Sequence, residues 1–199
     1  MATIVTDHPS EMRSPGPWTG PSPGVWAWAA LAVSVIVLGG SLYLSLGMKL
    51  KACGLCFYQR TFVMGVVGVL ALGLCVAWRS PRLVCLLALP AAAGGFGVAV
   101  FHVYLEQKGA LECPDGLFGW GTAPVQALAA QAVLLAVLGV AAVRNGGTMG
   151  RRGLAAAGAI LLGIVLAGAA VVSAPPSEPR TTPYPHPTPD VCRPPYHPS

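Results

Sequence analysis

The sequence predicts an all-α transmembrane fold, in which a four-helix bundle core is joined by a fifth transmembrane helix. Hydrophobic residues make up 54% of the 199 residues and charged residues only 10%, whereas about a quarter of a soluble domain is charged. Apolar stretches of about 20 residues recur along the chain, as in membrane-spanning helices. The segments between them are too short for a separate soluble domain.

Five apolar stretches are expected to cross a membrane, because roughly 20 helical residues at about 1.5 Å each cover about 30 Å of hydrocarbon. They are residues 25–48, 57–78, 83–105, 125–143 and 154–173.

The stretches divide the chain into four parts. We expect a cytoplasmic leader over 1–24, a four-helix core over 25–143, a cytoplasmic connector and fifth helix over 144–173, and a Pro-rich extracytoplasmic tail over 174–199. Proline cannot continue a helix, so the tail is expected to be extended.

Charge favours a cytoplasmic N-terminus. The short connectors 79–82 and 144–152 hold five arginines and no acidic residue, which is typical of the cytoplasmic side. The count of all basic residues does not favour either orientation, since six fall on each side. The net charge of +5 is scattered between the spans, so no nucleic-acid partner is expected.

A C-x-x-C pair, Cys53 and Cys56, stands where the second span begins, and Arg60 follows one helical turn later. The thiolate is the reactive form of cysteine. The positive end of the helix dipole and the Arg60 cation are both expected to lower a thiol pKa here. A charged residue at the edge of the bilayer is a functional candidate, although Arg60 could also reach lipid phosphates.

Other readings of the pair remain open. It could be a purely structural disulfide, or part of a zinc site completed by tail residues such as His186, Cys192 and His197.

The remaining cysteines separate by side of the membrane. With the N-terminus inside, Cys113 and Cys192 fall outside with the C-x-x-C pair, where disulfides persist. Cys75 and Cys85 fall near the cytoplasmic ends of their spans, where we expect them to be small buried residues.

Three segments carry a family resemblance: Gly40-Ser41-Leu42-Tyr43, Cys53-Gly54-Leu55-Cys56-Phe57-Tyr58-Gln59-Arg60, and Phe101-His102-Val103-Tyr104-Leu105-Glu106-Gln107. The chain resembles the DsbB family of membrane thiol:quinone oxidoreductases over roughly residues 25–143. The second segment is the specific one, because it matches the family's C-x-x-C followed by an aromatic pair, Gln or Glu, and Arg.

The resemblance implies a function in the bacterial cytoplasmic (inner) membrane. A thioredoxin-like (DsbA-type) oxidase would be re-oxidised there, and two electrons would pass to a quinone, either ubiquinone or menaquinone. Cys53 and Cys56 would form the quinone-proximal disulfide, with Cys56 engaging the ring and Cys53 the more exposed sulfur. Arg60 would hold a quinone carbonyl.

The chain departs from the family at the second disulfide, which joins two cysteines of one loop in the family. Loop 106–124 holds only Cys113, so we expect Cys192 to replace the missing partner. The roughly 18 residues before Cys192 could extend about 55 Å at polyproline rise. In the alternative, Cys113 is spare and Cys192 pairs with another molecule.

Two polar residues within spans have weaker assignments. His102 could assist proton or quinone handling, or simply hydrogen-bond a neighbour. Gln131 is expected to bond another helix.

The leading hypothesis is a disulfide-generating enzyme in which electrons pass from the partner to Cys113–Cys192, then to Cys53–Cys56, then to quinone. This would support disulfide formation in exported proteins. The alternatives are a membrane thiol reductant and a non-catalytic metal-binding or assembly protein.

Overall fold

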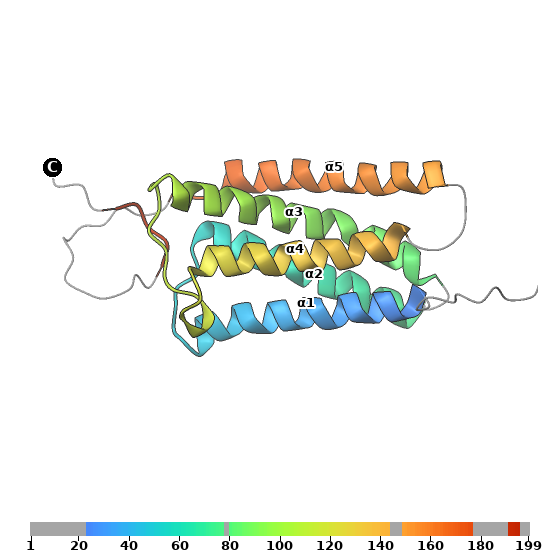
Figure 1. Cartoon of the computed structure of the whole chain (residues 1–199), viewed down its shortest axis with the longest axis horizontal. Coiled ribbons are helices and arrows are strands. Elements are labelled where there is room, and N and C mark those ends of the chain that lie inside the picture. The colour runs from blue at the N-terminus through green and yellow to red at the C-terminus, as the bar shows by residue number, and fades with distance from the viewer. Residues whose placement is uncertain (1–22, 78–79, 144–148, 177–190, 196–199) are drawn as a thin grey trace, which may run out of the picture.

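The structure is a computed structural model that describes residues 23–77, 80–143, 149–176 and 191–195 (Figure 1). Most of the predicted leader and of the Pro-rich tail, with His186 and His197, lies outside the described residues.

Five long helices confirm the predicted all-α membrane fold. Each is long and apolar enough to cross a membrane. The helices are α1 (Pro23–Leu46), α2 (Gly54–Val76), α3 (Pro81–Gln107), α4 (Ala123–Val143) and α5 (Met149–Ser173), with a short 3-10 helix, η1, at Leu117–Gly119. Their starts follow from local chemistry in two cases, since proline at the first position opens α1 and α3.

Helix α3 is the centre of the bundle. It packs against α2, α4 and α5, and α5 lies along it on the side away from α1 (Figure 1). Over half of the most apolar window of α3, 56%, is buried, against 11–28% in the other helices. The outward faces of the other helices keep large apolar side chains exposed, as lipid contact requires.

Small residues let α5 approach α3 closely. A Cβ on Gly163 would lie 2.5 Å from the Cβ of Ala93 and 2.6 Å from the carbonyl oxygen of Pro90. A Cβ on Gly97 would lie 2.8 Å from the Cβ of Ala167. Close backbone approach of this kind drives helix association in membranes, so α5 is part of the bundle.

One end of the bundle gathers the segment before α2, the loop between α3 and α4, and the described parts of the tail (Figure 1). The tail is held there by an antiparallel bridge, in which the Glu112 amide donates to the Arg193 carbonyl at 2.8 Å and the Arg193 amide donates back at 3.1 Å. Gln126 of α4 holds the loop by donating to the carbonyls of Leu117 (2.8 Å) and Trp120 (2.7 Å). This end positions the candidate site.

Candidate redox site

Cys53 and Cys56 flank the first turn of α2 as free thiols. Cys53 is the N-cap residue in an extended conformation, and its Sγ accepts a hydrogen bond from the Cys56 amide at 3.2 Å. The sulfur thus satisfies one of the amides that every helix start leaves open.

The expected order of exposure in this pair is wrong. Cys53 was predicted to be the more exposed sulfur, but its residue is only 7% exposed, whereas Cys56 is half-buried. Cys53 belongs to a buried cluster that includes Cys192 and Leu111, so the tail and the loop cover it.

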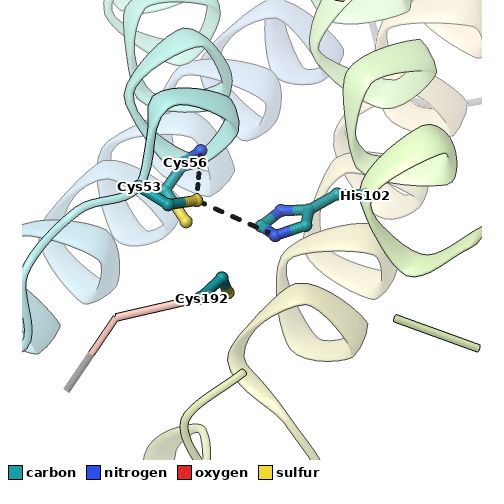
Figure 2. A group of neighbouring side chains, drawn as sticks. All are labelled: Cys53, Cys56, His102 and Cys192. Carbon is teal, nitrogen blue, oxygen red and sulfur yellow. Dashed lines mark hydrogen bonds between the residues drawn. The ribbon is translucent and has the colours of Figure 1, made fainter. Parts of the chain in front are cut away.

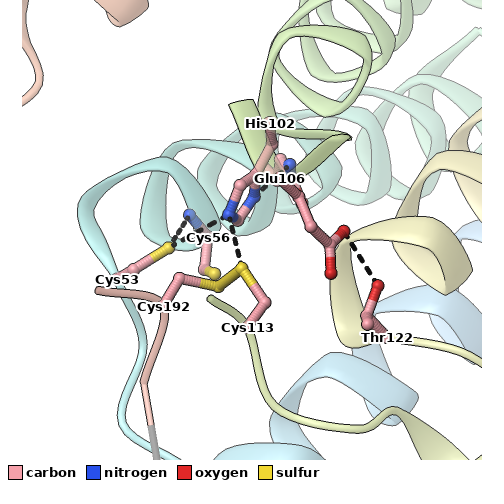
Figure 3. Close-up of a disulfide and its surroundings, with 8 residues drawn as sticks. Cys53, Cys56, His102, Glu106, Cys113, Thr122 and Cys192 are labelled. Atoms are coloured by element: carbon pink, nitrogen blue, oxygen red, sulfur yellow. Dashed lines mark hydrogen bonds between the residues drawn. A yellow bond between two sulfur atoms is a disulfide. The ribbon is translucent and has the colours of Figure 1, made fainter. Parts of the chain in front are cut away.

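Cys113 and Cys192 form a disulfide across 79 residues, with their Cα atoms 4.1 Å apart (Figure 3). This confirms the predicted pairing. The two residues differ in accessibility, because Cys192 is 2% exposed whereas Cys113 is half-buried.

The two cysteine pairs lie together. The sulfurs of Cys53, Cys56 and Cys192 and one ring nitrogen of His102 all lie within 4.8 Å of one another. Figure 2 shows the pair at the start of α2 facing His102 of α3, with Cys192 arriving from the tail. Disulfide exchange between the pairs therefore needs little movement of the chain.

His102 links the two pairs chemically. The side chain is fully buried, and its Nε2 lies 3.8 Å from the Cys53 sulfur and 3.6 Å from the Cys113 sulfur. Its Nδ1 lies 3.3 Å from Nε2 of Gln59, one helix away. A donor N–H from Gln59 to Nδ1 requires the neutral ring to carry its own proton on Nε2, which then points at sulfur.

The Cys53 thiolate is stabilised by its neighbours. The Cys56 thiol, the charge and hydrogen bond of His102, and the Cys56 amide together lower the pKa of Cys53 from an ordinary value of 9.0 to about 5, although burial opposes them. The sequence predicted a lowered thiol pKa but attributed it to the helix dipole and to Arg60, whereas hydrogen bonds from Cys56 and the hydrogen bond and charge of His102 are what lower the pKa of Cys53 here.

Arg60 is fixed by α1. Its Nε donates to the Ser41 hydroxyl at 3.1 Å, and its Nη2 donates to the Ser41 carbonyl at 2.9 Å and to the Ser45 hydroxyl at 2.6 Å. Among the described residues no carboxylate contacts Arg60, so its charge stays available for an anionic or polar ligand.

A cavity of about 320 Å³ opens between α1, α2, α4 and the loop. Its wall includes Cys56, Arg60 and Cys192, so it reaches both cysteine pairs. The rest of the wall is mainly apolar, as in most small-molecule sites. His102 is not among the lining residues; its ring contacts the sulfurs of Cys53 and Cys113 and the amide of Gln59 instead.

Gln131 of α4 also lines the cavity, and its expected helix-to-helix bond is not made. The residue is 2% exposed, and its Oε1 has no hydrogen-bond partner within the described part of the chain. The physical reason is local: the amide packs against Gly95 of α3, which offers it no side chain.

Comparison with known proteins agrees with this geometry. The family described as "Disulfide bond formation protein DsbB" matches residues 23–173, which is more than half of the chain.

The chain belongs to the DsbB family.

Named relatives are consistent with this assignment. Disulfide bond formation protein C of Bacillus subtilis is 32% identical over 120 residues, which cover 53% of this chain and 84% of the relative. Disulfide bond formation protein B 1 of Burkholderia lata is 35% identical over 83 residues, covering 41% and 48%. A "Probable disulfide formation protein" of Chlamydia trachomatis is 28% identical over 122 residues, covering 56% and 86%. No solved structure matches.

The DsbB family match extends further than the resemblance predicted from sequence. That resemblance was placed over 25–143, but the match continues to residue 173 and so includes α5. Together, the family and the relatives' names support a redox role in disulfide bond formation for this multi-pass membrane protein.

The sequence did not predict the roles of several residues of this DsbB-family site. Gln59 lies inside the recognised motif and Ser41 in the first resembling segment, yet their partners are on other helices. Ser45 and Gln131 lie in apolar runs. Of the two cysteines at the far end of the bundle, Cys85 is buried as expected, whereas Cys75 is exposed because it lies on the outer face of the last turn of α2.

Proposed function

We propose that this DsbB-family protein is a thiol:quinone oxidoreductase that re-oxidises a thioredoxin-like, DsbA-type partner outside the cytoplasm. The observation that carries the proposal is the cavity whose wall contains Cys56, Arg60 and Cys192. A small molecule in this cavity would lie beside two cysteine pairs that are close enough to exchange.

A quinone fits the residues of this cavity. The walls are apolar, as a lipid-soluble ring and its tail require, and Arg60 offers a donor to a ring oxygen. When bound, a quinone accepts two electrons and two protons and so restores the Cys53–Cys56 disulfide.

The first exchange takes place at Cys113, the more accessible sulfur of its disulfide. A thiolate of the reduced partner attacks Cys113, and the Cys113–Cys192 bond breaks to release Cys192 as a thiolate. The second partner thiolate then attacks the first, which frees Cys113 and leaves the partner oxidised.

The second exchange passes the electrons inward to an oxidised Cys53–Cys56 pair. The Cys192 thiolate attacks Cys53, and Cys56 leaves beside the cavity. Cys113 then attacks Cys192, which re-forms their disulfide and releases Cys53 as a thiolate. A leaving thiol of low pKa departs faster, and the pKa of Cys53 is about 5.

His102 assists this transfer because its Nε2 contacts both Cys53 and Cys113. The attacking Cys113 thiolate and the released Cys53 thiolate can each accept a hydrogen bond from the Nε2–H of the ring. Gln59 holds the ring in the required tautomer.

The same stabilisation supports the proposed direction of electron flow. A stabilised thiolate favours the reduced form of a pair, and this makes its disulfide a stronger oxidant. The low pKa of Cys53 therefore favours electrons moving from Cys113–Cys192 toward Cys53–Cys56 rather than outward, against the alternative of a membrane thiol reductant.

The assignment is tested with purified full-length protein, a reduced DsbA-type partner and a short-chain quinone, followed by quinone absorbance. Quinone should be consumed in proportion to the partner disulfide formed. Replacement of Cys56 by alanine should stop both, whereas Cys75→Ala, at the far end of the bundle, should not. Absence of quinone consumption by intact protein with a competent partner would defeat the proposal.

The proposed location is the bacterial cytoplasmic membrane, with the N-terminus inside and both cysteine pairs outside. After mild reduction of intact cells, a membrane-impermeant maleimide should modify Cys113 and Cys192. Modification only after the membrane is opened would reverse the orientation.

A metal site is the second candidate, since Cys53, Cys56, Cys192 and His102 are soft ligands within 4.8 Å of one another. The Cys113–Cys192 bond removes one of these ligands, so four-coordinate zinc would require its reduction. Protein purified without reductant should contain no stoichiometric zinc if the enzyme assignment holds. One zinc per chain, retained after Arg60→Ala, would favour the metal-binding alternative.

A further inference from the structure

Four potential metal ligands gather at the start of α2. Three are the sulfurs of Cys53, Cys56 and Cys192, and the fourth is a ring nitrogen of His102; all lie within 4.8 Å of one another (Figure 2). Three cysteines and one histidine are a complete ligand set for tetrahedral zinc. The geometry that allows disulfide exchange therefore also brings together a full set of ligands for a thiophilic metal ion.

The local structure of the C-x-x-C pair suits a metal ion. Zinc ligands are often two cysteines separated by two to four residues, and two residues separate Cys53 from Cys56. The Cys56 amide donates a hydrogen bond to the Cys53 sulfur at 3.2 Å. Hydrogen bonds of this kind orient metal ligands and tune their charge. Both thiols of the pair are free in this structure.

His102 has the second interaction that a metal-binding histidine uses. A metal-bound imidazole nearly always donates its other ring N–H to an oxygen or a water. Nδ1 of His102 lies 3.3 Å from the Gln59 amide nitrogen, and rotation of that amide by half a turn presents its oxygen instead. Nδ1 then carries the proton, and the Nε2 lone pair faces the Cys53 sulfur, 3.8 Å away. Metal binding thus selects the tautomer opposite to the one used in exchange.

The redox state of Cys192 decides whether the ligand set is complete. While Cys192 is bonded to Cys113, it offers no thiolate. Three thiolates accompany His102 only when both cysteine pairs are reduced, after four electrons have entered the protein. This state is reached when reduced partner protein supplies electrons faster than a quinone removes them.

An ion can reach the ligands through the cavity. Cys56 and Cys192 both belong to the cavity wall, so an ion inside the cavity meets two sulfurs directly. Cys53 and His102 are 7% and 0% exposed and complete the site on the side of the protein interior. Soft sulfur and imidazole ligands select zinc-like ions over Mg²⁺ and Ca²⁺, which prefer oxygen.

We propose that the fully reduced protein binds one thiophilic divalent cation, such as Zn²⁺, at the start of α2, and that the ion stops catalysis by occupying three of the sulfurs needed for exchange. Its ligands are Cys53, Cys56, Cys192 and His102. On binding, the thiols lose their protons to solvent and no electron is transferred. The oxidised enzyme lacks this site. Only the inhibition rests on the proposed function; ion binding does not.

The test uses full-length protein that has been freed of quinone and reduced anaerobically with a phosphine, which does not compete for metal as a dithiol would. Titration with Co²⁺ should give the charge-transfer absorption of a tetrahedral thiolate site at one ion per chain. Zn²⁺ should displace the Co²⁺, whereas Mg²⁺ should not. Oxidised protein should show no such absorption.

Alkylation provides a second readout that does not depend on activity. Zn²⁺ should slow the reaction of Cys53, Cys56 and Cys192 with N-ethylmaleimide at least tenfold, as followed by mass spectrometry of their peptides. The reaction of Cys113 should change little, because Cys113 is not one of the ligands.

Cys113→Ala and Cys192→Ala are a matched pair of variants. Each removes the same disulfide, but only the second removes a proposed ligand. With Cys53–Cys56 reduced, Cys113→Ala should bind Co²⁺ as tightly as fully reduced wild type. Cys192→Ala should bind it more weakly by more than the roughly 10–100-fold that loss of an outer-shell partner costs.

Gln59 should act as such an outer-shell partner. Gln59→Leu removes the oxygen that accepts from Nδ1 of His102 and should weaken Co²⁺ binding about 10–100-fold. Gln59→Glu keeps an oxygen acceptor and should retain most of the affinity.

Inhibition is measured in a single turnover without partner protein. Reduced wild type mixed with a short-chain quinone should consume it, prior addition of Zn²⁺ should prevent this, and a chelator should restore it. Unchanged quinone consumption at saturating Zn²⁺ overturns the inhibitory role. Protein that binds the ion as described but consumes no quinone, with or without chelator, refutes the proposed function and leaves the metal site in place.

The binding results have equally clear outcomes. Absence of thiolate absorption in reduced wild type, or equal Co²⁺ affinity in Cys113→Ala and Cys192→Ala, overturns the inference. Retention of the ion by oxidised protein overturns it as well, because the fully reduced state would then not be required. If the variants do not fold, the comparison of oxidised with reduced wild type decides.

Discussion

The Nε2 atom of His102 lies 3.8 Å from the sulfur of Cys53. His102 comes from the centre of the bundle and Cys53 from the cap of a neighbouring helix, so the packing of α3 on α2 controls the reactivity of the thiol. The first prediction concerns this control.

Replacing His102 by leucine should raise the pKa of Cys53. The wild-type thiol of the reduced pair should react with iodoacetamide with a midpoint near pH 5 and lose reactivity as the pH falls through that value. In His102→Leu the midpoint should move upward yet stay below 9.0, because the larger influence of Cys56 remains. Mass spectrometry of the Cys53 peptide, in a background without Cys75 and Cys85, gives the midpoint.

Tyr58→Phe is the matched control for His102→Leu. Tyr58 of α2 packs against the same cluster as Cys53, but its hydroxyl bonds Ser173 instead of a sulfur. Its loss should leave the Cys53 midpoint in place. Equal midpoints in wild type and His102→Leu would show that the histidine does not lower the pKa of Cys53.

Loss of Cys192 should block only the transfer of electrons from the partner protein. In Cys192→Ala the reduced DsbA-type partner should no longer drive quinone consumption, because Cys113 has no disulfide to offer. Dithiothreitol, which is small enough to reach Cys53–Cys56 directly, should still drive it. The measurement is the rate of quinone consumption by Cys192→Ala with each of the two reductants. Full partner-driven turnover in this variant would mean that the partner bypasses the tail.

The serine anchors of Arg60 should affect quinone binding more than turnover. In Ser41→Ala/Ser45→Ala the guanidinium keeps its charge but loses two of its three bonds. We expect the KM for quinone to rise about three- to tenfold with a smaller change in kcat. Arg60→Ala should raise the KM for quinone more than the double serine variant does.

Thr61→Val is the control for the serine anchors, because Thr61 is exposed and bonds only its own helix at Phe57. A double serine variant with the kinetics of Thr61→Val would show that the anchors are dispensable.

The close contact of α5 with α3 should be sensitive to a single methyl group. Gly163→Ala places a Cβ against Ala93 and the Pro90 backbone, which should cost about 1–3 kcal/mol of stability. In Gly158→Ala the new Cβ meets nothing within 4 Å, so this control should be neutral or slightly stabilising. Thermal unfolding and the fraction of Cys113–Cys192 disulfide on non-reducing gels should fall together in the first variant only.

The fold was predictable because hydropathy alone specifies membrane helices. The predicted spans lie within a few residues of α1–α5, and the spacing of Cys53, Cys56 and Arg60 places them at the N-cap and on the first two turns of α2. The Cys113–Cys192 bond was predictable as well, since only one other cysteine on that side lacked a partner.

The contacts between helices were not predictable in the same way. The Gln59–His102 pair is separated by 43 residues, and no periodicity in one helix reports which face of another it meets. The burial of Cys53 was missed for the same reason, because the tail that covers it is placed by the Glu112–Arg193 bridge. The unsatisfied acceptor of Gln131 depends on the absence of a side chain at Gly95, which becomes visible only when α3 and α4 are packed.

The order of the helices imposes a rule of parity on this chemistry. The C-x-x-C pair follows one membrane crossing, Cys113 follows three, and Cys192 follows five. All three counts are odd, so the four sulfurs share one compartment whichever way the chain inserts. Gain or loss of a single crossing between any two of these points would strand a sulfur on the opposite side of the bilayer, and for that reason α5 cannot be deleted without also relocating the last cysteine.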